Sequence, residues 1–169
     1  MQYIDVYNDG STLVVRSKQG FDLNPTKSIL VYVAAPVFKD IDVSGAGDVI
    51  SDNTISGNEP IHLHVSGSGD IKMQLNAPKV TTEVSGSGDI ALKGQAQDFS
   101  ANISGSGKVK CFDFVTDNTS LDLSGSSDAE VYANKKLDID VSGSGSIRYK
   151  GAPSINQHIS GSGDVRKVD

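Results

Sequence analysis

The sequence predicts an all-β protein: a right-handed parallel β-helix (solenoid) with coils of about 19 residues and an N-terminal strand or cap region. A short motif, in its full form apolar-Ser-Gly-Ser-Gly-Asp-apolar, returns at regular intervals. Apolar and polar residues alternate between the copies, and no segment keeps a helical spacing for more than one turn. The copies are VSGAGDV (43–49), VSGSGDI (65–71), VSGSGDI (84–90), ISGSGKV (103–109), LSGSSDA (123–129), VSGSGSI (141–147) and ISGSGDV (159–165).

The spacing of the copies sets the size of the coil. Their first serines are 22, 19, 19, 20, 18 and 18 residues apart. A single coil of this size buries too few apolar side chains to fold alone, so the coils have to stack. The preference for right-handed crossovers between parallel strands predicts the handedness. Left-handed hexapeptide helices keep coil lengths at strict multiples of six, and the variation of these spacings from 18 to 22 disfavours them.

The alternation predicts which side chains face inward. Around the third copy, Val84, Ile90 and Leu92 share one parity, whereas Ser85 and Asp89 share the other. The apolar residues that flank each motif therefore form two core columns. Both motif glycines fall on the inward parity, where a side chain would crowd a bend of the chain. We expect each motif to be the corner of a coil, with ladders of exposed serines and with aspartates that accept turn amides.

The motif divides the chain into two regions. Residues 39–169 form the repeat array, and residues 1–38 are predicted to be N-terminal strands or a cap of the same domain. Three alternating segments in the N-terminal region are expected to be strands, with Asp9-Gly10 as a turn between the first two. They are MQYIDVYNDG (1–10), STLVVRSKQG (11–20) and SILVYVAAP (28–36).

Composition excludes several classes of protein. The 169 residues carry a net charge of −6, which argues against a nucleic-acid partner. No run of about 18 apolar residues is present to span a membrane. The single cysteine, Cys111, lies on the apolar parity and is expected to be a buried, inert thiol. No cofactor motif is found, and the residues after Met1 show no export signal.

Outward ladders hold the candidate ligand residues. Asp122, Asp138 and Asp140 are expected to cluster on neighbouring coils, where a calcium ion could bridge them, although a solvated acidic face is the simpler interpretation. His62 and His64 form an H-x-H pair that a metal could use, but the sequence shows no third ligand. These five residues are the candidate ligand face, without an assigned catalytic or metal role.

The second strand of each coil carries a partly basic outward ladder. We interpret it first as a solubilising surface and second as a contact for an anionic glycan. Its members stand six residues after the first serine of each motif: Ile50, Lys72, Ala91, Lys110, Glu130, Arg148 and Arg166.

The motif and its period resemble the head GIN domain family of auto-transporter adhesins. The resemblance rests on [VIL]-S-G-[SA]-G-D-[VI] about every 19 residues and on the entry segment VYVAAPVFKDIDVSGAGD; it covers residues 28–169, and residues 3–21 also fit. The resemblance implies further strands ahead of YNDGSTLVVRSKQG, so the sequence is expected to be a fragment or a short member of the family. The resemblance implies a right-handed β-helix in secreted or envelope-anchored bacterial proteins, and it carries over no catalytic residue.

These observations predict a non-enzymatic secreted or cell-surface module. Its expected role is adhesion or envelope structure, with a cell-surface glycan or an envelope protein as the partner. One alternative is a polysaccharide lyase or hydrolase, for which Asp138 and Asp140 are suitably spaced carboxylates. The absence of tryptophan and the small number of aromatic residues weigh against it. A calcium-dependent binding module is the other alternative.

Overall fold

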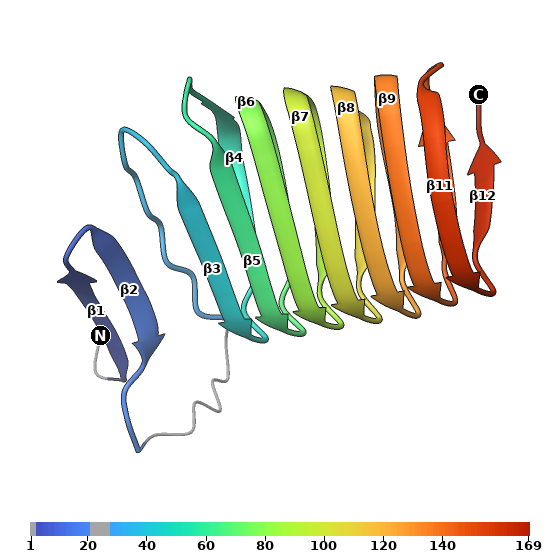
Figure 1. Cartoon of the computed structure of the whole chain (residues 1–169). Helices are drawn as coiled ribbons and strands as arrows, with labels where there is room; N and C mark the ends of the chain where they lie inside the picture. The colour runs from blue at the N-terminus through green and yellow to red at the C-terminus, as the bar shows by residue number, and fades with distance from the viewer. Residues whose placement is uncertain (1–2, 21–27) are drawn as a thin grey trace. The chain divides into compact units, whose positions relative to one another are not determined.

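The computed structural model describes residues 3–20 and 28–169, and within them every regular element is a β-strand. The chain forms two units, Met1–Ala35 and Pro36–Asp169 (Figure 1). Residues 1–2 and 21–27, which belong to the expected N-terminal cap, lie outside the described residues. The assignment of residues 1–38 to a cap of the same domain stays a prediction.

The N-terminal unit contains one antiparallel hairpin. Strands β1 (Ile4–Asp9) and β2 (Thr12–Ser17) pair through Val6 and Val15, and Gly10 takes a φ of +60° at the turn. The first two expected strands and their turn are therefore confirmed. The third is wrong: residues 28–36 form no strand, and Leu30 and Tyr32 are 69% and 81% exposed. Alternation alone does not produce a strand without a neighbour to complete its hydrogen bonds.

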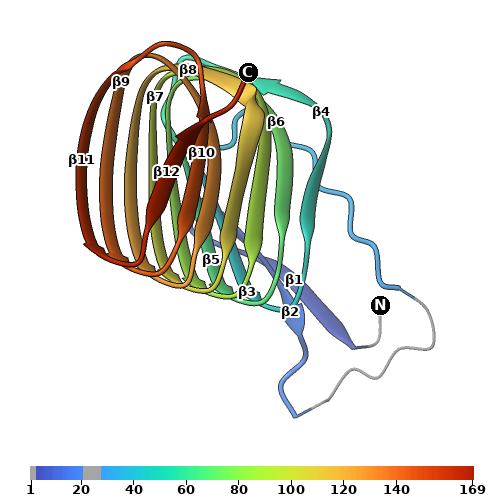
Figure 2. The same cartoon turned by 90° about the vertical axis from the view of Figure 1, so that its right-hand side faces the viewer.

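The second unit is a β-solenoid of parallel strands. In the long strands a bend near the middle lets one strand supply both walls of a coil (Figures 1 and 2). The strands are β3 (Asp40–Gly45), β4 (Val49–Ser56), β5 (Ile61–Gly67), β6 (Ile71–Gly86), β7 (Asp89–Gly105), β8 (Lys108–Gly125), β9 (Asp128–Gly143), β10 (Ser146–Lys150), β11 (Ser154–Gly161) and β12 (Asp164–Lys167). The order in the sheet is β12-β10-β9-β8-β7-β6-β5-β3, with β11 on β9 and β4 on β6.

The direction of the chain around the coil confirms the expected right-handed helix. In Figure 1 the strands that end at a motif point down, β12 points up, and the coils advance from left to right. Figure 2 looks along the axis from the C-terminal end and places β11 and β12 on opposite walls. The chain therefore turns counter-clockwise as it approaches the viewer, which is the right-handed sense. We call the wall with β3, β5 and β11 the first wall and the opposite one the second wall.

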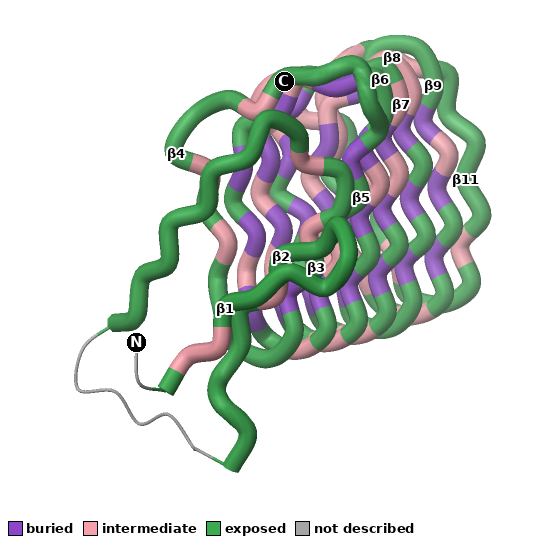
Figure 3. The backbone as a smooth tube through the Cα atoms, turned by 90° about the vertical axis from the view of Figure 1, so that its left-hand side faces the viewer, coloured by how far each residue is buried: buried purple, intermediate pink, exposed green. Residues whose placement is uncertain are grey.

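The core lies between the two walls. Burial alternates along the strands, as Figure 3 shows in purple and green. The apolar residues before and after each motif are buried in the inner coils and half-buried at the ends of the array, where Val49, Ile159 and Val165 have fewer neighbours. Cys111 is buried, and this burial raises the pKa of its thiol to about 12. The thiol is therefore protonated and inert at neutral pH, as expected.

Each motif forms a corner that stacks on the corner of the preceding coil. The amide of the second motif serine donates a hydrogen bond to the carbonyl of the first motif glycine one coil earlier. This bond recurs at 2.8–2.9 Å from Ser68 to Ser162, over six successive corners. The predicted coil corner is confirmed, and the repeated bond explains why the serine and glycine positions stay in register.

Both glycines of the motif make room for the backbone of the preceding coil. A Cβ on Gly86, whose φ is +132°, would lie 2.2 Å from the carbonyl oxygen of Gly67. A Cβ on Gly88 would lie 2.2 Å from the carbonyl oxygen of Gly69 and also 2.7 Å from Cγ1 of Val65 in the core. The expectation that a side chain at either glycine would crowd the interior therefore holds for the second glycine, whereas at the first the atoms in the way are those of the preceding corner.

This geometry predicts the cost of adding a methyl group to the corner. Gly86→Ala should lower the free energy of unfolding by roughly 2–5 kcal/mol, because it combines a left-handed backbone with a clash against Gly67. Gly45→Ala has the same motif position and a φ of +90°, but its Cβ meets nothing within 4 Å. It should cost only about 1–2 kcal/mol. Urea denaturation of the two variants measures the difference.

Ser87→Ala is the control for this comparison, because the Ser87 side chain is exposed. Its effect should stay within about 0.5 kcal/mol. Equal losses for Gly86→Ala and Gly45→Ala would mean that the strained backbone, and not the stacking of corners, accounts for the glycine.

Candidate functional site

Three adjacent columns of outward side chains on the first wall form what we call the polar face. Strand pairing aligns the members of each column across the coils, as the ladders predict. The first column is Asp40, His62, Thr81, Ser100, Ser120, Asp138 and Asn156. The second is Asp42, His64, Glu83, Asn102, Asp122, Asp140 and His158, and the third consists of the motif serines Ser44, Ser66, Ser85, Ser104, Ser124, Ser142 and Ser160.

The polar face is rich in oxygen atoms and contains no lysine or arginine in its three columns. Six carboxylates lie on it, together with all three histidines of the chain. Its remaining side chains are hydroxyls and amides. The wall therefore presents hydrogen-bond donors and acceptors with an excess of negative charge.

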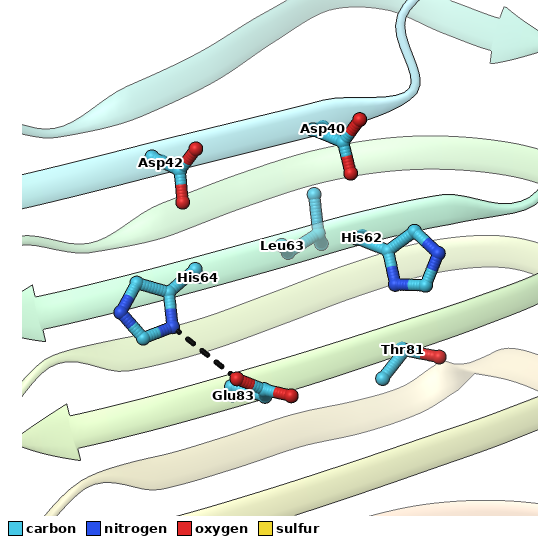
Figure 4. Close-up of a pocket in the computed structure, with 7 residues that line it drawn as sticks. All are labelled: Asp40, Asp42, His62, Leu63, His64, Thr81 and Glu83. Carbon is cyan, nitrogen blue, oxygen red and sulfur yellow. Dashed lines mark ion pairs between the residues drawn. The ribbon is translucent and has the colours of Figure 1, made fainter.

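The polar face is hollowed near its N-terminal end. One depression of about 340 Å³ lies over β3, β5 and β6, between the side chains of Asp40, Asp42, His62 and Glu83 (Figure 4). A second, of about 330 Å³, continues from His64 and Glu83 to Asn102, Asp122 and Ser124. Because both share His64 and Glu83, they form one open channel across neighbouring coils, which we call the trough.

One ion pair crosses the trough between two coils. Nδ1 of His64 lies 3.6 Å from Oε2 of Glu83, and both side chains stay largely exposed (Figure 4). In the same view His62 lies between Asp40 of the preceding coil and Thr81 of the following one. The sequence analysis chose the two histidines as candidates. Asp40, Asp42 and Glu83 belong to the same predicted outward ladders, one coil before or after the histidines, but were not chosen.

The structure places the other candidate residues further along the same wall. Asp122 and Asp140 are neighbours across β8 and β9, and Asp140 is also aligned with His158. Asp138 instead accepts a hydrogen bond from Nζ of Lys136 at 2.5 Å. Among residues 3–20 and 28–169, no group of three or more histidine, cysteine, aspartate or glutamate side chains is arranged to hold a metal ion. The role of the five candidate residues as a ligand face stays a prediction.

The second wall uses its charges differently. Most of its cations pair with carboxylates, mainly those at or near the corners, which reduces the positive charge available to an anionic ligand. These pairs are Lys72–Asp70 at 3.1 Å, Lys110–Asp89 at 2.7 Å, Lys108–Asp128 at 3.4 Å, Arg166–Asp164 at 2.7 Å, Lys93–Asp113 at 3.5 Å and Arg148–Glu130.

The corner aspartates also connect successive coils. Oδ1 of Asp48 accepts the amide of Asp70 at 3.0 Å, and Oδ1 of Asp70 accepts the amide of Asp89 at 3.1 Å. The prediction that these aspartates accept turn amides is confirmed, with the amide coming from the next coil. The hydrogen bonds from the Asp89 amide and from Lys72 lower the pKa of Asp70. The hydrogen bond to Asp89 raises the pKa of Lys110.

Fold and polar face together define a β-solenoid with one open, oxygen-rich wall and one wall of paired charges. The sequence profile of a known family matches residues 1–153, and the family is described as "Putative auto-transporter adhesin, head GIN domain". The chain belongs to this family, as the resemblance implied. Comparison with curated protein sequences found no match.

Crystal structures of three bacterial proteins share the fold. A "putative adhesin" from Bacteroides fragilis NCTC 9343 is 25% identical with a TM-score of 0.88, and the match covers 99% of this chain and 77% of that one. A "Putative lipid binding protein" from Parabacteroides distasonis ATCC 8503 is 26% identical with a TM-score of 0.80, and the match covers 99% of this chain and 80% of that one. A "putative adhesin" from the same organism is 25% identical with a TM-score of 0.75, and the match covers 99% of this chain and 79% of that one.

The bond between coils at Asp70 predicts a pH-dependent stability. Asp70→Ala should lower the free energy of unfolding at neutral pH by about 1.5–3 kcal/mol, because it removes an ionised acceptor of two hydrogen bonds. The folded pKa of Asp70 is lowered from 3.8, so this stabilisation is complete well above pH 3.8 and is lost as the pH falls through the lowered value. Denaturation of both proteins across this range measures it.

Asp113→Asn is the matched control for Asp70→Ala. Asp113 also pairs with a lysine on the second wall, but its side chain is 70% exposed. Its substitution should change stability by less than about 1 kcal/mol. A gap between wild type and Asp70→Ala that stays constant down to strongly acidic pH would contradict the role of the ionised carboxylate.

Proposed function

We propose that the chain is a non-enzymatic secreted or cell-surface module for adhesion, and that it contacts a surface glycan through the polar face. The observation that carries the proposal is the trough, an open channel lined by hydroxyl, amide, imidazole and carboxylate groups on a rigid sheet. Such groups recognise sugar hydroxyls through hydrogen bonds. The family description and the two structural relatives described as adhesins support the same role.

The polar face supports binding better than catalysis. A glycosidase needs one carboxyl group that stays protonated in a buried site and a second one at a defined separation. Asp138 is ion-paired with Lys136, and Asp140 lies on the exposed surface beside it. The trough is open along its length, so it lacks walls that would exclude water from a reacting bond. These features favour reversible contact.

A location outside the cytoplasm is part of the proposal. It rests on the adhesin description of the family, which implies an exposed binding surface. No helix in the described part of the chain has the length and apolar character needed to cross a bilayer.

The proposal predicts that one charge placed in the trough weakens adhesion. Protein immobilised on beads should retain cell-wall polysaccharide or whole cells, and Asn102→Lys should reduce this retention by roughly tenfold, a loss of about 1.4 kcal/mol. Asn102 lies between Glu83 and Asp122 in the second column, so the new ammonium group would pair with these carboxylates and cover the trough. Quantifying bound polysaccharide per bead provides the measurement.

Gln74→Lys is the matched control. Gln74 is an exposed amide in an outward position of the second wall, and its substitution makes the same change of charge away from the trough. Retention should be unchanged by this substitution.

Two further measurements address the alternatives. A calcium chelator should leave retention unchanged, and no reducing ends or unsaturated products should be released from the polysaccharide. Turnover abolished by Asp140→Asn would support the enzyme alternative, and loss of retention with the chelator would support the calcium-dependent one.

A further inference from the structure

The trough runs along the axis of the solenoid and not along a strand. Five successive coils each contribute one side chain of the second column to the trough. These side chains are Asp42, His64, Glu83, Asn102 and Asp122. Neighbouring strands of a sheet lie about 4.8 Å apart, so one polar side chain is offered at each such step. A ligand that contacts the whole trough has to cross the coils and to repeat at a similar interval.

This interval distinguishes a sugar polymer from a peptide. An extended peptide places side chains on one side about every 6.6–6.8 Å, so it loses register with the ladder after two coils. A linear chain of pyranose rings advances by close to one strand spacing per sugar. Each coil can therefore meet one sugar of such a chain with one side chain from each column of the polar face.

The charge of the trough selects among sugar polymers. Asp40, Asp42, Glu83 and Asp122 line it, and none of its lining residues is a lysine or arginine. Polymers of uronic acids or sulfated sugars would meet like charges, which costs affinity and slows association. A polymer that carries protonated amines would meet complementary charges along its length. The hydroxyl and amide groups of Thr81, Asn102 and Ser124 remain available to the sugar hydroxyls.

We propose that the trough binds a linear glycan of amino sugars whose amines are free, lying along the solenoid axis with about one sugar per coil. This inference rests on the proposed function, because it names the ligand of the same face. The carboxylates bind the ammonium groups, and the neutral side chains of the three columns bind the ring hydroxyls.

Glucosamine oligomers of increasing length provide the test, in buffer where their amines are protonated. Calorimetric titration of the full chain should show affinity that rises with each sugar up to about five, the number of coils that line the trough, and changes little beyond. The fully N-acetylated hexamer should bind at least several-fold more weakly, and a galacturonate hexamer should show no binding. Equal binding of all three hexamers, or tighter binding of the galacturonate, would overturn the proposal.

Two matched variants locate the site. Glu83→Gln removes the carboxylate that both depressions share and keeps the shape of the side chain; it should weaken binding of the glucosamine pentamer by roughly two- to fivefold, the range for one exposed ion pair. Glu130→Gln makes the same change on the second wall, where Glu130 pairs with Arg148, and should leave affinity unchanged. An equal loss in both variants would assign the effect to net charge and contradict a site in the trough.

The outcomes separate this inference from the proposed function. If beads retain cell-wall polysaccharide in an Asn102-dependent manner while glucosamine oligomers fail to bind, the adhesion proposal stands and the amino-sugar assignment is wrong. If a lysine-rich peptide binds the trough more tightly than the glucosamine pentamer, the polymer is a protein segment and the inference is also wrong.

Discussion

The stacked corner is the constraint on which the rest of the solenoid depends. Each corner combines a glycine with positive φ, a serine amide that donates to the glycine carbonyl of the preceding coil, and space for that carbonyl where a side chain would otherwise stand. Because the contact is between backbones, it repeats wherever the motif repeats. It fixes the register of the coils, and the apolar columns of the core follow from that register.

The same register creates two walls of different chemistry. On the second wall, carboxylates at the corners lie within reach of lysine and arginine side chains, so most charges there are paired. On the polar face of the first wall the residues aligned with each other are carboxylates, histidines, amides and hydroxyls, and their charge is left largely uncompensated. Affinity for a ligand is therefore expected where charge is unpaired, since paired charges have little left to offer a partner.

Periodic features could be predicted from the sequence, and local ones could not. Motif spacing and alternation predicted the coil, the core columns and the ladders, because each depends on a pattern repeated seven times. The handedness followed from the general preference for right-handed crossovers between parallel strands. Residues 28–36 alternate as a strand would but form none, since a strand requires a neighbour that alternation does not supply. The trough was not predicted: the outward ladders align Asp40, Asp42 and Glu83 with His62 and His64, but whether such side chains enclose a depression depends on their sizes and conformations in adjacent coils.

Hydrogen exchange at the corners tests the central claim most directly, that stacked corners hold the coils in register. The test uses three backbone amides whose residues have exposed side chains, those of Ser87, Ser106 and Ser126. Each amide donates a hydrogen bond to a glycine carbonyl one coil earlier, so it should exchange only when the whole solenoid unfolds. Their free energy of opening should equal the global value from urea denaturation. Opening free energies several kcal/mol below the global value at these three amides would show that the corners fray independently, and would contradict the account.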